Sequence, residues 1–156
     1  MDKTVNMPLD VVIMAAGKGT RMKSTLPKVL HRLGGKPLLE HVIDAAAQLN
    51  ARSAVVITGH ESKVVQNAIN LIANEAINTP ARVIFNAYKS INSVLQEPQL
   101  GTGHAVQQAV PVLPDDGMVL VLSGDVPLTQ VDTLRDLIAT SGGDKLALLT
   151  IDFENP

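Results

Sequence analysis

The sequence predicts an α/β fold built on a mainly parallel sheet. Short runs of branched aliphatic residues alternate along the chain with longer stretches in which apolar residues recur at helical spacing. The aliphatic runs are continuous rather than alternating, which is typical of strands covered on both faces. Strands that alternate with helices form parallel sheets, and such sheets bind ligands beyond the carboxyl ends of their strands. Polar residues that follow a strand are therefore the first candidates for a functional site.

Five aliphatic runs are expected to form the strands. They are Val11–Ala15, Ala54–Thr58, Arg82–Phe85, Val119–Leu122 and Leu146–Ile151. Aromatic residues make up only 2% of the chain, so the core between strands and helices should be aliphatic.

Two longer helices are expected between the first three strands. The first begins near Pro37, a residue that suits a first helical turn. Its apolar residues recur at i, i+3, i+4 and i+7 and are Leu39, Val42, Ile43 and Ala46. The second follows Ser62, a residue type favoured at N-caps. It repeats the same spacing with Val65, Ala68, Ile69 and Ile72.

The remaining connections are also assigned from the pattern. Asn74–Pro80 is expected to be a polar loop, and Gly103–Val110 a shorter helix. Thr129 and Asp132 have the spacing of a capping box, which predicts a helix start there. The apolar face of this last helix should consist of Val131, Leu134 and Ile138.

Composition excludes several functional classes. The 13 Lys and Arg residues face 15 Asp and Glu residues, giving a net charge of −2, whereas nucleic-acid-binding domains carry a basic excess. The absence of cysteine excludes disulfides, thiolate catalysis and cysteine metal sites. The apolar run Val11–Ala16 near the N-terminus is too short for a signal sequence or a membrane span. We therefore expect a cytoplasmic protein that binds neither nucleic acid nor membrane.

The loop after the first strand has the composition of an anion-binding loop. It spans Met14–Lys28, reads MAAGKGTRMKSTLPK and contains no acidic residue. Gly17 and Gly19 permit positive φ and close backbone approach, and successive N–H groups there can form a nest for an anion. Its basic residues are Lys18, Arg21, Lys23 and Lys28. A merely solvated basic loop is the alternative interpretation.

Two common phosphate-binding loops do not fit this stretch. A Walker A loop requires G-x-x-x-x-G-K-[ST], but here Gly19 follows Gly17 after a single residue. A dinucleotide-binding fingerprint requires G-x-G-x-x-G and an acidic residue at the end of the second strand. Met22 stands at the position of the third glycine, and the second strand ends in Thr58-Gly59-His60 without an acid.

The stretch MAAGKGTRMKSTLPKVLH resembles the signature of the sugar-phosphate nucleotidyltransferases. Two further stretches narrow the resemblance to the N-terminal uridyltransferase domain of the bifunctional N-acetylglucosamine-1-phosphate uridyltransferase/glucosamine-1-phosphate acetyltransferases. LQEPQLGTGHA at Leu95–Ala105 is similar to their base-recognition segment, and SGDVPL at Ser123–Leu128 to their metal-binding turn. The implied fold is a Rossmann-like nucleotidyltransferase three-layer sandwich, of which only the N-terminal part is present.

The resemblance implies transfer from UTP to N-acetylglucosamine-1-phosphate, giving UDP-N-acetylglucosamine for cell-wall and lipopolysaccharide synthesis, and pyrophosphate. A sugar-phosphate oxygen attacks the α-phosphorus, so the protein aligns two anions and neutralises charge. By resemblance, Arg21 contacts the pyrophosphate part of UTP and Lys28 the α-phosphate, and these two are the implied catalytic residues. The residues implied to line the nucleotide are Met14, Ala15, Ala16 and Gly17.

The same resemblance assigns base recognition to Gln96, Gly101 and Thr102, and metal binding to Asp125. An amide carries both a donor and an acceptor, which suits the edge of uracil. One carboxylate can hold Mg²⁺ when waters and phosphate oxygens supply the remaining ligands. The alternatives without a ligand are a polar loop around Gln96, a helix-capping role for Asp125 and a surface position for Lys28.

The histidines show no spacing typical of a metal site. They are His31, His41, His60 and His104. His104 lies inside the base-recognition segment, and we expect it to be structural.

The resemblance also predicts the extent of the domain. Residues 1–156 correspond to the N-terminal part of a MobA-like NTP transferase domain, without the rest of the catalytic domain or the left-handed β-helix acetyltransferase domain. Such a fragment is expected to bind nucleotide with little turnover, and a homotrimer is implied only for the full-length protein. Two alternatives stay open: a related cytidylyl- or guanylyltransferase, and a non-catalytic nucleotide-binding module. The Gln96–Thr102 segment favours uracil, and the presence of Lys28 with Asp125 argues against a pure binding module.

Overall fold

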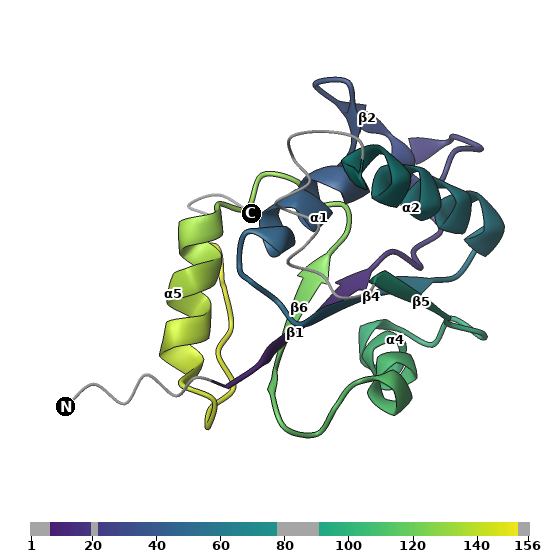
Figure 1. The fold of residues 1–156 in the computed structure, drawn as a ribbon. Helices are drawn as coiled ribbons and strands as arrows, with labels where there is room; N and C mark the ends of the chain where they lie inside the picture. The colour runs from purple at the N-terminus through teal and green to yellow at the C-terminus, as the bar shows by residue number, and fades with distance from the viewer. Residues whose placement is uncertain (1–6, 20–21, 78–90, 153–156) are drawn as a thin grey trace.

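The protein is represented by a computed structural model that describes residues 7–19, 22–77 and 91–152 (Figure 1). Its centre is a four-stranded sheet in the order β5-β4-β1-β6. These strands are β1 (Leu9–Met14), β4 (Ser53–Thr58), β5 (Ile91–Leu95) and β6 (Met118–Ser123). Strand β1 pairs in parallel with β4 and β6, and β4 pairs in parallel with β5. The prediction of an α/β fold with a mainly parallel sheet is confirmed.

Helices cover both faces of this sheet, so the fold has three layers. Figure 1 shows α1 and α2 on one face and α4 on the other, with α5 beside β6. The helices are α1 (Leu38–Ala47), α2 (Ser62–Ile77), α4 (Thr102–Ala109) and α5 (Val131–Ser141). Short 3₁₀ helices, η2 (Lys28–Leu30) and η3 (Val110–Val112), and a small hairpin, β2 (Arg32–Leu33) with β3 (Lys36–Pro37), complete the described elements. Among the described residues no helix is long and apolar enough to cross a membrane.

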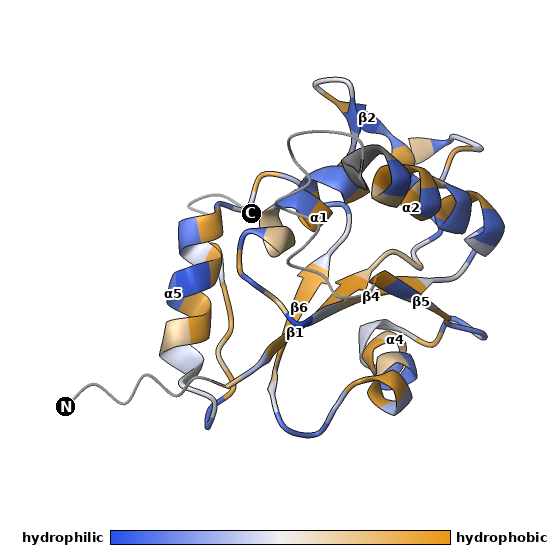
Figure 2. Cartoon of the chain, in the orientation of Figure 1, coloured by the Kyte–Doolittle hydropathy of each residue, from blue (hydrophilic) through white to orange (hydrophobic). Residues whose placement is uncertain are grey.

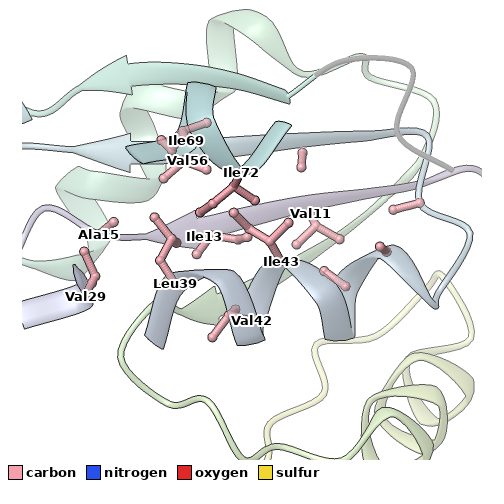
Figure 3. Packing of buried hydrophobic residues seen from close by; sticks show 14 of the residues in the cluster. Val11, Ile13, Ala15, Val29, Leu39, Val42, Ile43, Val56, Ile69 and Ile72 are labelled. Atoms are coloured by element: carbon pink, nitrogen blue, oxygen red, sulfur yellow. The ribbon is translucent and has the colours of Figure 1, made fainter. Parts of the chain in front are cut away.

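The larger part of the core lies between the sheet and helices α1 and α2. Val11 and Ile13 of β1 are fully buried there against Leu39 and Ile43 of α1 and Ile69 of α2 (Figure 3). Side chains alternate across a strand, so the residues between them face the other way. The helical spacing predicted for α1 and α2 is confirmed, since its apolar positions are those that enter this core.

The second face of the sheet packs against α4. Val12 of β1 and Val55 and Ile57 of β4 are buried there with Ala105 and Ala109 of the helix. Burial on both faces explains why the central strands are continuous aliphatic runs. In Figure 2 the sheet is mainly orange, whereas the flanking helices carry both orange and blue residues, as expected for helices with one buried face.

Two predicted helix boundaries are wrong. Helix α5 has Gln130 as its N-cap, without a side-chain capping bond, and Asp132 pairs with Arg135 at 2.7 Å. The predicted capping box of Thr129 and Asp132 is therefore absent. Helix α2 begins at Ser62 itself and continues to Ile77, so residues 74–77 are helical rather than part of a polar loop. Residues 62–77 contain neither glycine nor proline, so none of them breaks the helix.

One predicted strand lies outside the described residues, and another is wrong. The run Arg82–Phe85 lies outside the described residues, and the strand beside β4 is β5. The run Leu146–Ile151 forms no strand, although it is strongly apolar. Its described neighbours include the edge strand β6, but the two do not pair. An apolar run becomes a strand only when a neighbouring strand completes its hydrogen bonds, and sequence periodicity does not report that.

Candidate functional site

A cavity of about 280 Å³ opens at the carboxyl edge of the sheet. The strand order reverses between β1 and β6, because β4 and β5 lie on one side of β1 and β6 on the other. Loops that leave neighbouring strands at such a switch point diverge and leave a crevice for a ligand. The residues that line the cavity are Met14, Ala16, Gly17, Lys28, Val29, Gln96, Gln99, Gly101, Thr102, Ala105, Ser123 and Asp125.

The cavity brings together most of the residues that the sequence singles out. These are Met14, Ala16, Gly17, Lys28, Gln96, Gly101, Thr102 and Asp125. Ala15 does not line the cavity: it is buried, and its N–H donates to the carbonyl of Ile57 at 2.8 Å. Arg21 lies outside the described residues. Residues that are far apart in the sequence thus share one site.

Lys28 and Asp125, which both line the cavity, form an ion pair. Lys28 is the first residue of η2, and the next two residues, Val29 and Leu30, are buried and anchor that turn in the core. Asp125 follows β6 in a turn whose Gly124 N–H donates to the carbonyl of Met14 at 2.9 Å. Both side chains remain partly accessible, 39% for Lys28 and 27% for Asp125. A cation and a carboxylate side by side can face a phosphate oxygen and a divalent cation, respectively.

The glycines of the first loop have different roles. Gly19 has φ of 59°, and a Cβ atom there would lie 2.9 Å from the Cβ of Lys28. Only glycine lets the loop fold back against Lys28 in this way. Gly17 lines the cavity, but its φ is not positive and its Cβ position is open. Gly19 therefore uses the positive φ that glycine permits, whereas Gly17 does not.

Gln99 is a cavity residue that the sequence did not identify. Its Nε2 donates to the carbonyl of Ala16 at 2.7 Å, which ties the loop after β5 to the loop after β1. A Cβ atom on Gly59, at the end of β4, would lie 2.3 Å from that Nε2 and 2.8 Å from the Ala16 carbonyl oxygen. Gly59 therefore leaves the space that the Gln99 amide occupies. The Gln99 amide is visible within LQEPQLGTGHA, but nothing in the sequence identifies Ala16 as its partner.

Gln96 is almost completely buried, with 4% of its surface exposed at the cavity. Its backbone N–H donates to the Thr58 carbonyl at 2.8 Å, one residue beyond the β4–β5 pairing. Its side-chain Nε2 donates to the carbonyl of Gly101 at 2.9 Å and lies 3.3 Å from Nδ1 of His104. A buried amide held at both its backbone and its side chain presents a fixed hydrogen-bonding pattern to a ligand.

The acidic content of the cavity is low. Of the described residues that line it, Asp125 alone is acidic. Within residues 7–19, 22–77 and 91–152 no three His, Cys, Asp or Glu side chains gather closely enough to hold a metal ion. A metal at Asp125 would therefore depend on ligands from outside the described protein, such as water and phosphate.

A larger cavity of about 560 Å³ lies between β6, α5 and residues 146–151. Its lining is mainly aliphatic, and Lys145 is the single charged residue among the described residues that form it. It lacks convergent polar groups, so the smaller cavity is the better candidate for a functional site.

Comparisons with known sequences agree with the motifs. Residues 11–155 match the family described as MobA-like NTP transferase domain. The chain is 66% identical over 148 residues to the bifunctional protein GlmU of Albidiferax ferrireducens, and 64% identical over 149 residues to that of Polaromonas naphthalenivorans. These alignments cover 95% and 96% of this chain but 30% and 29% of the relatives. The chain thus spans less than a third of the length of these curated relatives.

Solved structures show the same fold at low sequence identity. A UDP-glucose pyrophosphorylase from Acinetobacter baumannii superposes with a TM-score of 0.68 at 22% identity, covering 88% of this chain and 54% of that chain. A 4-diphosphocytidyl-2C-methyl-D-erythritol synthase from Anaerococcus prevotii gives a TM-score of 0.59 at 16% identity, covering 87% and 51%. The arrangement of strands and helices is therefore that of the nucleotidyltransferases.

Proposed function

We propose that this chain, which belongs to the family of MobA-like NTP transferase domains, provides the UTP site of an enzyme that transfers a uridylyl group to N-acetylglucosamine-1-phosphate. The products would be UDP-N-acetylglucosamine and pyrophosphate. One observation carries the proposal: the cavity joins the glycine-rich loop, Lys28, Gln96 and Asp125 in a single site. The 66% identity to a bifunctional protein GlmU supports the choice of substrates.

The cavity residues have distinct roles in this reaction. The oxygen of the sugar phosphate attacks the α-phosphorus of UTP and pyrophosphate leaves, so the protein stabilises negative charge and supplies no nucleophile. Lys28 faces the α-phosphate, where its ammonium stabilises the developing charge. Gln96 and the neighbouring Gly101 and Thr102 hold the base. Arg21, outside the described residues, is assigned to the pyrophosphate part of UTP.

Mg²⁺ fits this donor set as a proposed cofactor. It binds proteins through one or two carboxylates and keeps waters and substrate phosphate oxygens as its other ligands. The single carboxylate of Asp125 in the cavity matches that demand. When bound there, Mg²⁺ would neutralise phosphate charge and orient the leaving group.

The Lys28–Asp125 ion pair holds together the side chains proposed to bind the α-phosphate and the metal. Each side chain neutralises the other in the structure. With nucleotide and Mg²⁺ bound, Lys28 would pair with a phosphate oxygen and Asp125 would hold the cation, so each charge would exchange one partner for another. Neither charge would then be left without a partner.

The proposal extends to the longer proteins that share this segment. A cytoplasmic location and a homotrimer are part of it, as the family resemblance implies. The substrates are small phosphorylated molecules, and neither nucleic acid nor a membrane is required.

Nucleotide titration of the chain in the presence of Mg²⁺ tests the site directly. We expect UTP to bind more tightly than CTP, GTP or ATP. Lys28→Ala should weaken UTP binding by about tenfold or more, because a charge-assisted hydrogen bond is lost. Lys36→Ala is the matched control, since Lys36 also pairs with a carboxylate, Asp44, but lies outside the cavity. Equal affinities of the two variants for UTP would contradict the assignment of Lys28.

Pyrophosphate release by the full-length gene product tests the reaction. We expect release from UTP with N-acetylglucosamine-1-phosphate and Mg²⁺, and a strong loss in Asp125→Asn. Release with CTP or GTP but not with UTP would overturn the proposed base.

A further inference from the structure

We propose that His104 is a positioning residue that holds the Gln96 amide with its oxygen toward the cavity and thereby selects uracil over cytosine. The inference rests on the proposed function and deepens it. His104 lies in the first turns of α4, one residue away from the cavity-lining Ala105. The sequence alone suggests a structural residue, but the contacts of its ring give it a second role.

The orientation of the Gln96 amide is fixed by a backbone carbonyl. Its Nε2 lies 2.9 Å from the oxygen of Gly101. A carbonyl oxygen can only accept, so the nitrogen of the amide, and not its oxygen, must face Gly101. Gln96 is also buried, so an unpaired polar atom at this contact would be costly.

This orientation determines which ring nitrogen of His104 carries the proton. The same Nε2 of Gln96 lies 3.3 Å from Nδ1 of His104. An amide nitrogen only donates, and a neutral imidazole has one bare nitrogen and one N–H. Nδ1 is therefore the bare acceptor, and the proton is on Nε2.

Gln108 holds the other side of the ring. Its Nε2 lies 3.1 Å from Nε2 of His104 and donates to the His104 carbonyl at 3.3 Å, one helical turn along α4. Two amide nitrogens cannot both donate to one neutral imidazole. The bond from Gln96 to Gly101 is the shorter one, 2.9 Å against 3.3 Å for the bond from Gln108 to the His104 carbonyl, and Gln96 is the more buried amide. We therefore assign the turn to Gln108, which gives up its bond to the His104 carbonyl and places its oxygen at Nε2–H. The chain of contacts then runs from Gln108 through His104 to Gln96.

These contacts leave one atom of the Gln96 amide, Oε1, to form a hydrogen bond with a ligand. Both hydrogens of the Gln96 Nε2 are directed to protein acceptors, Gly101 O and His104 Nδ1. No described residue donates to Oε1, which is the amide atom left to meet a base. Uracil offers it the N3–H donor, whereas cytosine has a lone pair at N3 and could donate only from its N4 amino group, which requires the base to shift within the site. Turning the amide to suit cytosine would set Oε1 against the Gly101 carbonyl, so the site discriminates by leaving polar groups unpaired.

Substitution of His104 gives the first test. His104→Leu removes the acceptor for Gln96 and should lower the ratio of UTP to CTP affinity by about tenfold. His104→Asn should restore most of that ratio, because its Oδ1 takes the position of Nδ1. His41→Leu is the control: His41 contacts the Leu33 carbonyl at 2.8 Å, away from the cavity, and its loss should leave the ratio unchanged. Isothermal titration with both nucleotides and Mg²⁺ measures all four proteins.

Two further measurements keep the proposal falsifiable if His104→Leu does not fold. Gln108→Glu provides an acceptor that cannot donate, so the ratio should stay at or above the wild-type value. In the unliganded wild type, the ¹⁵N spectrum of the imidazole should show Nδ1 of His104 without a proton. A proton on Nδ1 would overturn the proposal whether or not nucleotide binds.

The outcomes separate the two proposals. If the wild type fails to bind UTP, the proposed function is wrong, and base selection is lost with it. If the wild type prefers UTP but His104→Leu and His104→Asn keep the full ratio, the proposed function stands and the positioning role of His104 is wrong. A loss of the ratio in both variants would also contradict it, since the Asn oxygen should replace Nδ1.

Discussion

At the scale of single residues, Asp10 is a fully buried carboxylate in the central strand β1. A charge buried in this way needs a partner of opposite charge. It accepts hydrogen bonds from Arg52 Nη2 at 2.5 Å and from Ser53 Oγ at 2.6 Å. Burial alone would raise the pKa of Asp10, but the hydrogen bonds from Arg52 and Ser53 and the charge of Arg52 outweigh it and hold the pKa below its ordinary value. The same contact raises the pKa of Arg52. The pair joins β1 to the start of β4.

Breaking this pair should cost much more than breaking one at the surface. Arg52→Ala leaves the carboxylate of Asp10 buried without its cation, so the free energy of unfolding should fall by about 3 kcal/mol. Arg135→Ala is the matched control, because its pair with Asp132 is 56% and 88% exposed, and it should cost less than about 1 kcal/mol. Urea denaturation of both variants measures the difference. Similar losses would show that burial does not set the strength of the Asp10 pair.

The lowered pKa of Asp10 also predicts a pH dependence. A group whose pKa is lower in the folded state adds stability above its unfolded pKa and loses it as the pH falls through the folded value. The free energy of unfolding should therefore decline below about pH 4, near the unfolded value of an aspartate. In Asp10→Asn this part of the decline should be absent, although the variant is less stable at neutral pH. Urea denaturation between pH 5 and pH 3 compares the slopes, and equal slopes would contradict the assignment.

At the scale of elements, the side-chain amide of Gln99 lies where the loops after β1, β4 and β5 meet. Gln99, after β5, bonds to Ala16, after β1, in the space left by Gly59, after β4. Gly59→Ala places a methyl group where the Gln99 amide lies, so we expect the amide to leave. The free energy of unfolding should fall by about 1–3 kcal/mol, and UTP should bind more weakly.

Gly103→Ala is the matched control for stability. Gly103 lies within α4, and no atom lies within 4 Å of its Cβ position. Alanine should leave the melting temperature unchanged or raise it, because it favours helix over glycine. Thermal unfolding compares the two variants. A melting temperature for Gly59→Ala as high as that of Gly103→Ala would show that the loops do not depend on this contact.

The elements also show what sequence patterns can predict. Helices α1 and α2 follow from the helical spacing of their apolar residues, and strands β1, β4 and β6 from continuous aliphatic runs. Strand β6 is covered on one face only, since Val119 and Val121 are 44% and 39% exposed. Strand β5 was missed because its residues, INSVL, mix polar and apolar types at the sheet edge. The run Leu146–Ile151 was wrongly predicted as a strand because pairing depends on a neighbour that composition does not reveal.

At the scale of the whole molecule, the order of the strands makes the site. Met14, Gln96 and Asp125 each follow or end a strand, and the parallel sheet brings those ends to one edge. The sequence could predict this grouping from the topology of parallel sheets. It could not predict the Lys28–Asp125 pair or the contact of His104 with Gln96, because such contacts depend on turn geometry and rotamers.

The same strand order predicts a gradient of local stability across the molecule. Strand β1 has a partner on each side and is buried on both faces, so its amides should open only on global unfolding. Residues 146–151 form no strand, and the side chains of Leu146, Leu148, Leu149 and Ile151 are 55% to 88% exposed. Hydrogen exchange followed by mass spectrometry should therefore find the slowest amides in Val11–Ile13 and rapid exchange over 146–151. Slow exchange in that segment would mean that it pairs with the edge of β6, and the sheet would then be larger than the four strands described.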